Sequence, residues 1–161
     1  MTNSNATLTS NSFIKNNSTK GGAVAFLCDL GTVCNAVLEN NTFVENSALE
    51  GSAIHYNLFR PDIKDTNTFD RNEATYGYVV SSFPSYLEMP SEDHLNDIAS
   101  GQRIANSLLF RVLDYDGQVI LSDNSSILII QSTESGSAVT GETQRVAVKG
   151  EFLFTDLEFE A

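Results

Sequence analysis

The segment NSFIKNNSTKGGAV at residues 11–24 recurs as NTFVENSALEGSAI at residues 41–54 and as NTFDRNEATYGYVV at residues 67–80. In each copy Phe stands two positions after the first Asn, a second Asn five positions after it and Gly ten positions after it. The copies start 30 and 26 residues apart. A period in this range is typical of stacked repeats, in which no single unit can bury its own apolar face.

The residues around each Phe favour strands rather than helices. They form short β-prone runs bounded by Asn and Gly, without an apolar stripe of helical period. The sequence therefore predicts an all-β chain that begins with a short right-handed parallel β-helix of about three coils, spaced ~4.8 Å apart like ordinary strands. We expect an aromatic column of Phe13, Phe43 and Phe69, one amide ladder of Asn11, Asn41 and Asn67, and a second of Asn16, Asn46 and Asn72.

Two residue types suit the corners of such coils. Asn tolerates left-handed backbone geometry, and its amide can donate to the coil on one side while it accepts from the coil on the other. Gly21, Gly51 and Gly77 recur at another turn, where a positive φ would disfavour a Cβ. Loops of variable length are expected between the repeats, in residues 25–40 and 55–66.

The FxxN elements (FIKN, FVEN and FDRN) and the GGAV at Gly21 resemble the repeat of polymorphic outer-membrane proteins, which belong to the pectin-lyase-like β-helix group. Similar coils occur in very large surface proteins of ciliates, interspersed with small β-sandwich segments. The resemblance covers residues 1–83. The sequence departs from the family pattern at Gly51, where GSA replaces GGA, and at Gly77, where GYV replaces it. It implies a surface protein built from several such segments.

The second half of the chain lacks the repeat. Residues 84–98 contain Pro84 and Pro90 and are expected to form a cap and linker. Residues 99–161 alternate apolar and polar residues, so they predict a small antiparallel β-sandwich with a hairpin turn at DYDG, residues 114–117. This part resembles bacterial-type immunoglobulin-like modules but is shorter than a complete sandwich, so we expect open edges.

The charge of the chain excludes two classes of partner. The sequence holds 21 acidic and 9 basic residues, a net charge of −12. A polyanion repels phosphate backbones and anionic lipid, so we expect neither nucleic-acid binding nor membrane insertion by this segment. No stretch has the features of a signal peptide or a membrane span. Because the chain opens and closes in repeat-like and strand-like sequence, we expect it to be a segment of a longer protein.

Cysteine spacing and glycosylation motifs both indicate an extracellular location. Cys28 and Cys34 bracket a short polar loop, which predicts a disulfide, with two free thiols as the alternative. N-linked glycans are expected at the acceptor sequences of a secreted protein, which begin at Asn5, Asn16, Asn17, Asn40 and Asn124.

The sequence contains few candidate catalytic or metal-binding residues. The charged positions after Phe (Lys15, Glu45, Asp70 and Arg71) change sign from coil to coil, which is typical of a solvated face rather than of a lyase site. The calcium-like start at Asp114 and Asp116, with Asp123 beyond, lacks the later oxygen ligands, so a plain hairpin turn is favoured. The only histidines, His55 and His94, lie far apart in the sequence. We therefore expect no enzyme activity, no cofactor and no metal.

The leading hypothesis is a structural module of an extracellular fibre or cell-surface coat. Stacked coils without caps expose unpaired backbone, so the expected partners are further copies of the chain or neighbouring segments that stack end to end. The alternative is an adhesion or carbohydrate-binding module, whose loops at Cys28–Cys34 and Asn57–Asp65 contact a partner. A polysaccharide lyase or hydrolase is a third, weaker reading.

Overall fold

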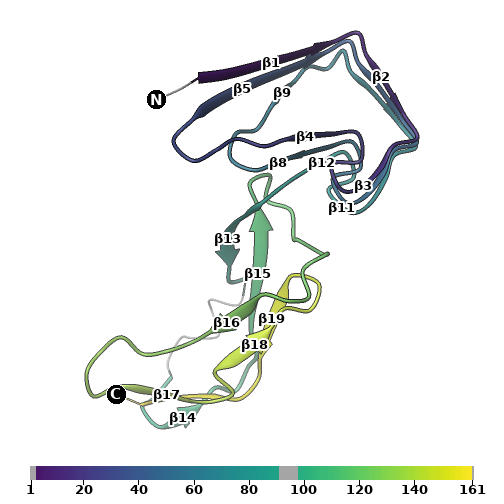
Figure 1. Ribbon diagram of the computed structural model, residues 1–161. Coiled ribbons are helices and arrows are strands. Elements are labelled where there is room, and N and C mark those ends of the chain that lie inside the picture. The colour runs from purple at the N-terminus through teal and green to yellow at the C-terminus, as the bar shows by residue number, and fades with distance from the viewer. Residues whose placement is uncertain (1–2, 91–97, 161) are drawn as a thin grey trace. The chain divides into compact units, whose positions relative to one another are not determined.

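Figure 1 shows the computed structural model, which describes residues 3–90 and 98–160. These residues form strands and turns without helices, so the predicted all-β class is confirmed, with parallel sheets first and antiparallel sheets after them. The chain divides into two compact units. The first comprises residues 1–84 and the turn at 114–118, and the second comprises residues 85–113 and 119–161.

The first unit is a parallel β-helix of three coils (Figure 1). Strands in the same position of successive coils pair in parallel, which gives four sheets of three strands. The first coil contains β1 (Asn3–Thr9), β2 (Ser12–Ile14), β3 (Asn17–Lys20) and β4 (Val24–Phe26). The second contains β5 (Val33–Glu39), β6 (Thr42–Val44), β7 (Ser47–Glu50) and β8 (Ile54–Tyr56). The third contains β9 (Asp62–Ile63), β10 (Thr68–Asp70), β11 (Glu73–Tyr76) and β12 (Val80–Ser82).

The repeat register places like residues above like. Phe13, Phe43 and Phe69 lie opposite one another in β2, β6 and β10. Their rings stack with centroids 4.9 Å apart in both pairs and with interplanar angles of 10° and 9°. This separation is the ordinary spacing of neighbouring strands, so the column adds contact without bending the backbone. Phe43 is fully buried with Leu38 and Ile54, whereas the two outer rings are partly buried.

The corners of the coils use left-handed residues at a position other than the ladder Asn. Lys15, Glu45 and Arg71, each just before an Asn of the second ladder, have φ of 55°, 53° and 47°. Our expectation that Asn adopts this geometry itself is therefore wrong for the ladder positions. Gly51 has φ of 64°, and a Cβ there would lie 2.1 Å from the Ile54 carbonyl oxygen, which explains glycine at that turn.

The second unit is antiparallel. Its strands are β13 (Pro84–Glu88), β14 (Gln102–Arg103), β15 (Leu108–Asp114), β16 (Ile127–Ile129), β17 (Ala138–Gly141), β18 (Gln144–Val146), β19 (Glu151–Phe154) and β20 (Leu157–Glu160). They form the sheets β13-β15-β19, β14-β20-β17 and β16-β18. Leu108 lies opposite Phe154, and Phe110 opposite Phe152, so the period-two apolar face packs as one core.

The segment expected to be a cap and linker, residues 84–98, includes strand β13. Pro84 begins this strand, a position that proline tolerates because its missing N–H is least needed there. Residues 91–97, and with them His94, lie outside the described residues.

Candidate functional site

The two amide ladders run in one direction along the stack. Asn41 Oδ1 accepts hydrogen bonds from the backbone N and the Nδ2 of Asn11, at 3.0 and 3.1 Å. Asn46 Oδ1 accepts in the same way from Asn16, at 3.0 and 2.8 Å. The same pattern joins Asn41 to Asn67, and Asn46 to Asn72. Each ladder Asn of the first two coils thus donates to the Asn of the following coil. Asn41 Nδ2 and Asn46 Nδ2 also donate back to carbonyl groups of the first coil.

This direction leaves the first coil with open acceptors. No residue in the described ranges donates to Asn11 Oδ1 or Asn16 Oδ1, although the equivalent atoms one coil later each accept two hydrogen bonds. The backbone of β2 is open on the same side. Asn11 O accepts from Thr42 N, and Lys15 N donates to Val44 O. Because a parallel ladder uses alternate residues on each side, the peptide groups of Ser12 and Ile14 point away from the second coil.

A second set of contacts between coils is ionic. Lys15 Nζ lies 3.4 Å from Glu45 Oε2, and Arg71 lies 3.0 Å from Glu45 Oε1, so one column reads basic, acidic, basic. The hydrogen bond from Lys15 lowers the pKa of the Glu45 carboxyl. In a neighbouring column Lys20 Nζ lies 2.7 Å from Glu50 Oε2. The sign changes that predicted a solvated face therefore also pair the coils with one another.

The opposite edge of the stack is closed at β12. The outward-pointing N–H of Ser82 donates to Asp114 Oδ2 at 3.1 Å, and the outward-pointing carbonyl of Val80 accepts from Gln118 Nε2 at 3.0 Å. The Ser82 carbonyl accepts from the Tyr76 hydroxyl at 3.0 Å. All these residues belong to the first unit. The turn at 114–118 therefore caps the last strand of the third coil, a role that our sequence reasoning missed.

The DYDG turn uses its carboxylates for this cap. Asp114 is completely buried, and its Oδ1 accepts from the backbone N of Asp116 and of Gln118, both at 2.9 Å. Asp116 accepts from the Tyr56 hydroxyl at 2.9 Å and from Arg60 Nε at 2.6 Å. Burial and the hydrogen bond to Asp116 raise the pKa of Tyr56 to about 12. Both carboxylates thus face N–H and O–H donors, as in a structural turn.

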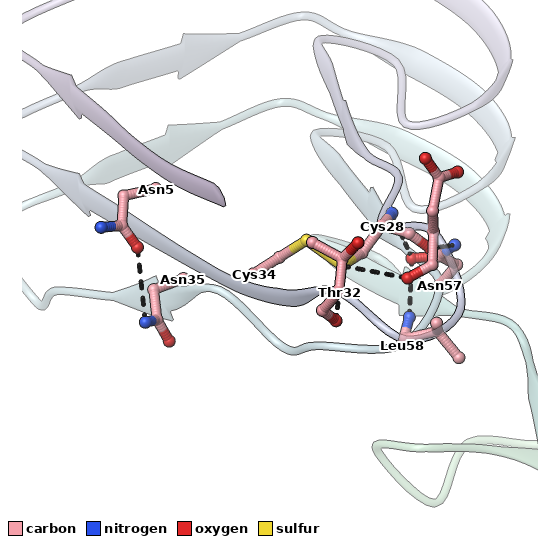
Figure 2. The surroundings of a disulfide bond; sticks show 8 residues. Asn5, Cys28, Thr32, Cys34, Asn35, Asn57 and Leu58 are labelled. Atoms are coloured by element: carbon pink, nitrogen blue, oxygen red, sulfur yellow. Dashed lines mark hydrogen bonds between the residues drawn. A yellow bond between two sulfur atoms is a disulfide. The ribbon is translucent and has the colours of Figure 1, made fainter. Parts of the chain in front are cut away.

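The predicted disulfide joins Cys28 and Cys34, whose Cα atoms are 6.1 Å apart (Figure 2). The loop is also held by Asn57 of the following coil, which accepts from Cys28 N at 2.9 Å and donates to Cys28 O at 2.8 Å. The tip carries apolar side chains to solvent, with Leu27 71% and Leu30 89% exposed. A shallow groove of about 400 Å³ lies between the tip and Phe59.

The acceptor asparagines of the five glycosylation motifs are all exposed. Asn5 accepts from Asn35 at 3.5 Å on the outer face of β1, as Figure 2 shows. Asn17 donates to Ser47 Oγ, and Asn40 has φ of 55° at a corner. Asn16 differs because its amide belongs to the second ladder. Asn124 lies in the second unit, where it accepts from Lys149 N at 3.0 Å.

His55 lies in β8 and is only 1% exposed. Its Nδ1 is 2.8 Å from Ser81 Oγ, which is also buried, while its Nε2 has no hydrogen-bond partner in the described part of the chain. Burial lowers the pKa of His55 to about 4. Neither side chain can meet a substrate from solvent, so the pair suits packing between coils rather than nucleophilic chemistry.

Within residues 3–90 and 98–160 we find no cluster of three or more metal-binding side chains. The same ranges contain no helix with the length and hydropathy that a membrane crossing requires. Comparison of the chain with models of protein families, with curated proteins and with solved structures gave no match.

The buried, neutral His55 predicts acid sensitivity. Its pKa is about 4 in the folded protein against an ordinary value of 6.5. Between these values the unfolded chain binds the proton and the folded chain does not, so this contribution to stability falls as the pH drops from about 6.5 towards 4, with a slope of up to about 1.4 kcal/mol per pH unit. Urea titrations of the wild type and of His55→Gln across this range would measure it. An equally steep loss of stability in the variant would contradict the assignment.

Proposed function

We propose that this chain is a non-catalytic structural module of an extracellular fibre or cell-surface coat, and that it stacks end to end with neighbouring segments. The observation that carries the proposal is the open edge of the first coil, where the Phe column and both Asn ladders end together. Unpaired strand edges of this kind recruit further strands unless a cap covers them. Here a cap is built on β12, at the other end of the stack.

The sequence motifs support a repeat family and an extracellular location for the module. We propose that the coils are of the polymorphic outer-membrane protein type within the pectin-lyase-like group, as in large ciliate surface proteins, and that the second unit is immunoglobulin-like. The FxxN register, which aligns Phe13, Phe43 and Phe69, supports the first assignment. The disulfide and the five exposed acceptor asparagines support an extracellular, glycosylated protein.

Negative-stain electron microscopy of the native material tests the structural role. We expect filaments or sheets with an axial repeat, because a directional ladder adds segments along one axis. Discrete, monodisperse particles without an axial repeat would contradict the proposal.

The alternative function is adhesion or carbohydrate binding through the disulfide loop. The strong exposure of Leu27 and Leu30 favours it, because apolar side chains presented on a stapled loop often serve recognition.

Deletion of residues 29–33 distinguishes the structural proposal from the adhesion alternative. If the protein is structural, the deletion variant still assembles and loses no binding to cells or glycan arrays, because β5 loses only its first residue, Val33, and the other strands of the coils are unchanged. If binding is lost while assembly is retained, the adhesion alternative replaces the structural proposal. Circular dichroism would verify that the variant keeps its strand content.

A further inference from the structure

The geometry of the first coil points to a specific partner. We propose that the outer edge formed by β1, β2, β3 and β4 binds a parallel coil of the same FxxN repeat, carried by a neighbouring segment, whose residues over Lys15 and Lys20 are acidic. This inference rests on the proposed end-to-end assembly and names the partner in it.

The hydrogen-bonding groups on this edge specify a parallel coil. Between the first two coils, the Asn of one coil donates its backbone N and its Nδ2 to the Oδ1 of the next. Asn11 Oδ1 and Asn16 Oδ1 therefore stand where the ladder would receive the donors of a preceding coil. The outward peptide groups of Ser12 and Ile14 would continue the strand ladder beside them.

The aromatic column specifies the residue that enters the core. Phe43 is covered on both faces, by Phe13 and Phe69, and is completely buried. Phe13 is covered on one face only. A partner with Phe in register would bury the second face at the 4.9 Å spacing already present in the stack.

The charges specify which FxxN coil fits. Lys15 and Lys20 pair with Glu45 and Glu50 of the second coil, and both lysines are substantially exposed. A preceding coil with acidic residues at these two positions would place each lysine between two carboxylates. Single ion pairs at a surface contribute only about 0–1 kcal/mol, so the charges select among coils while the backbone and Phe contacts hold them.

The same charges disfavour a second copy of this chain as the partner. A second copy would present its third coil, in which Arg71 occupies the column of Lys15, so that two basic side chains would be stacked. In addition, the β12 edge of that coil is already closed by Asp114 and Gln118. The partner is therefore a coil of the second type, with the charge pattern of NTFVENSALEG at residues 41–51.

A tandem variant tests the inference with the whole chain intact. A copy of residues 33–56, with Cys34→Ser in the copy, is fused ahead of Met1 through a short Gly/Ser linker, which raises its effective concentration at the edge. Amide hydrogen exchange is followed by NMR at Ser12, Ile14 and Asn17 in the tandem and in the original chain. We expect exchange at these amides to slow by at least about tenfold in the tandem, because their N–H groups become part of a ladder.

The matched control reverses the charges of the appended copy at the positions of Glu45 and Glu50, both to Lys. We expect weaker protection in this control, with the difference shrinking as salt is raised. Unchanged exchange in the acidic tandem would overturn the inference, and equal protection by both copies would overturn the acidic specificity. Neither result depends on whether filaments appear in the native material, so a failure of this inference is distinguishable from a failure of the proposed function.

Discussion

The hydrogen bonds from one ladder Asn to the next are the interaction on which the first unit depends. Asn41, Asn46 and Asn72 are buried, and a buried amide is costly unless its donors and acceptor are paired. Each of these three side chains forms its hydrogen bonds with a neighbouring coil. The asparagines can therefore be buried without unpaired groups only when the coils are stacked in register. Asn46 illustrates this, because it accepts from Asn16 while it donates to Phe13 O and to Asn72 Oδ1. The apolar column of Phe13, Phe43 and Phe69 is placed by the same register.

A stack built in this way has two unlike ends. The hydrogen bonds between ladder asparagines all run from one coil to the Oδ1 of the next, so among the described residues the Oδ1 atoms of the first coil receive no donor. In the third coil, the backbone N and the Nδ2 of Asn67 donate instead to Lys64 O. The two ends also differ in the hydrogen bonds that their outermost strands accept and donate. At the third coil, Asp114 and Gln118 supply side-chain partners to the edge of β12. At the first coil, the four strands are all outermost in their sheets, as are β9, β10 and β11 of the third coil, but among the described residues only β12 has such a cap. This asymmetry links the geometry of the amide ladder to the proposal of assembly in one direction.

Features marked by a recognisable sequence signal, such as a repeat or a cysteine spacing, could be predicted from the sequence, and features without such a signal could not. Phe and Asn recur at fixed offsets, so their alignment follows from the strand pairing. The spacing of Cys28 and Cys34 favoured a disulfide over two free thiols, and the two residues form one. The pairing of Lys15 with Glu45 was visible as a change of sign, but sign alone does not distinguish a solvated face from an ionic column. The cap by Asp114 has no periodic signal, because it lies 32 residues from Ser82 and belongs to a turn outside the repeat. The left-handed residue before each Asn of the second ladder was also missed, since Lys15, Glu45 and Arg71 are neither glycine nor asparagine, the residues that usually adopt this geometry.

The most direct test of the central claim compares the free energy of unfolding of Asn46→Ala with that of Asn16→Ala, in protein made without glycosylation. Both substitutions remove one amide from the same ladder, but Asn46 is buried between two coils and Asn16 lies at the open edge. Asn46→Ala leaves Asn16 N and Phe13 O without partners, so we predict a loss of about 3 kcal/mol, against about 1 kcal/mol or less for Asn16→Ala. Equal losses for the two variants would contradict the account, because the ladder would then contribute no more inside the stack than at its edge.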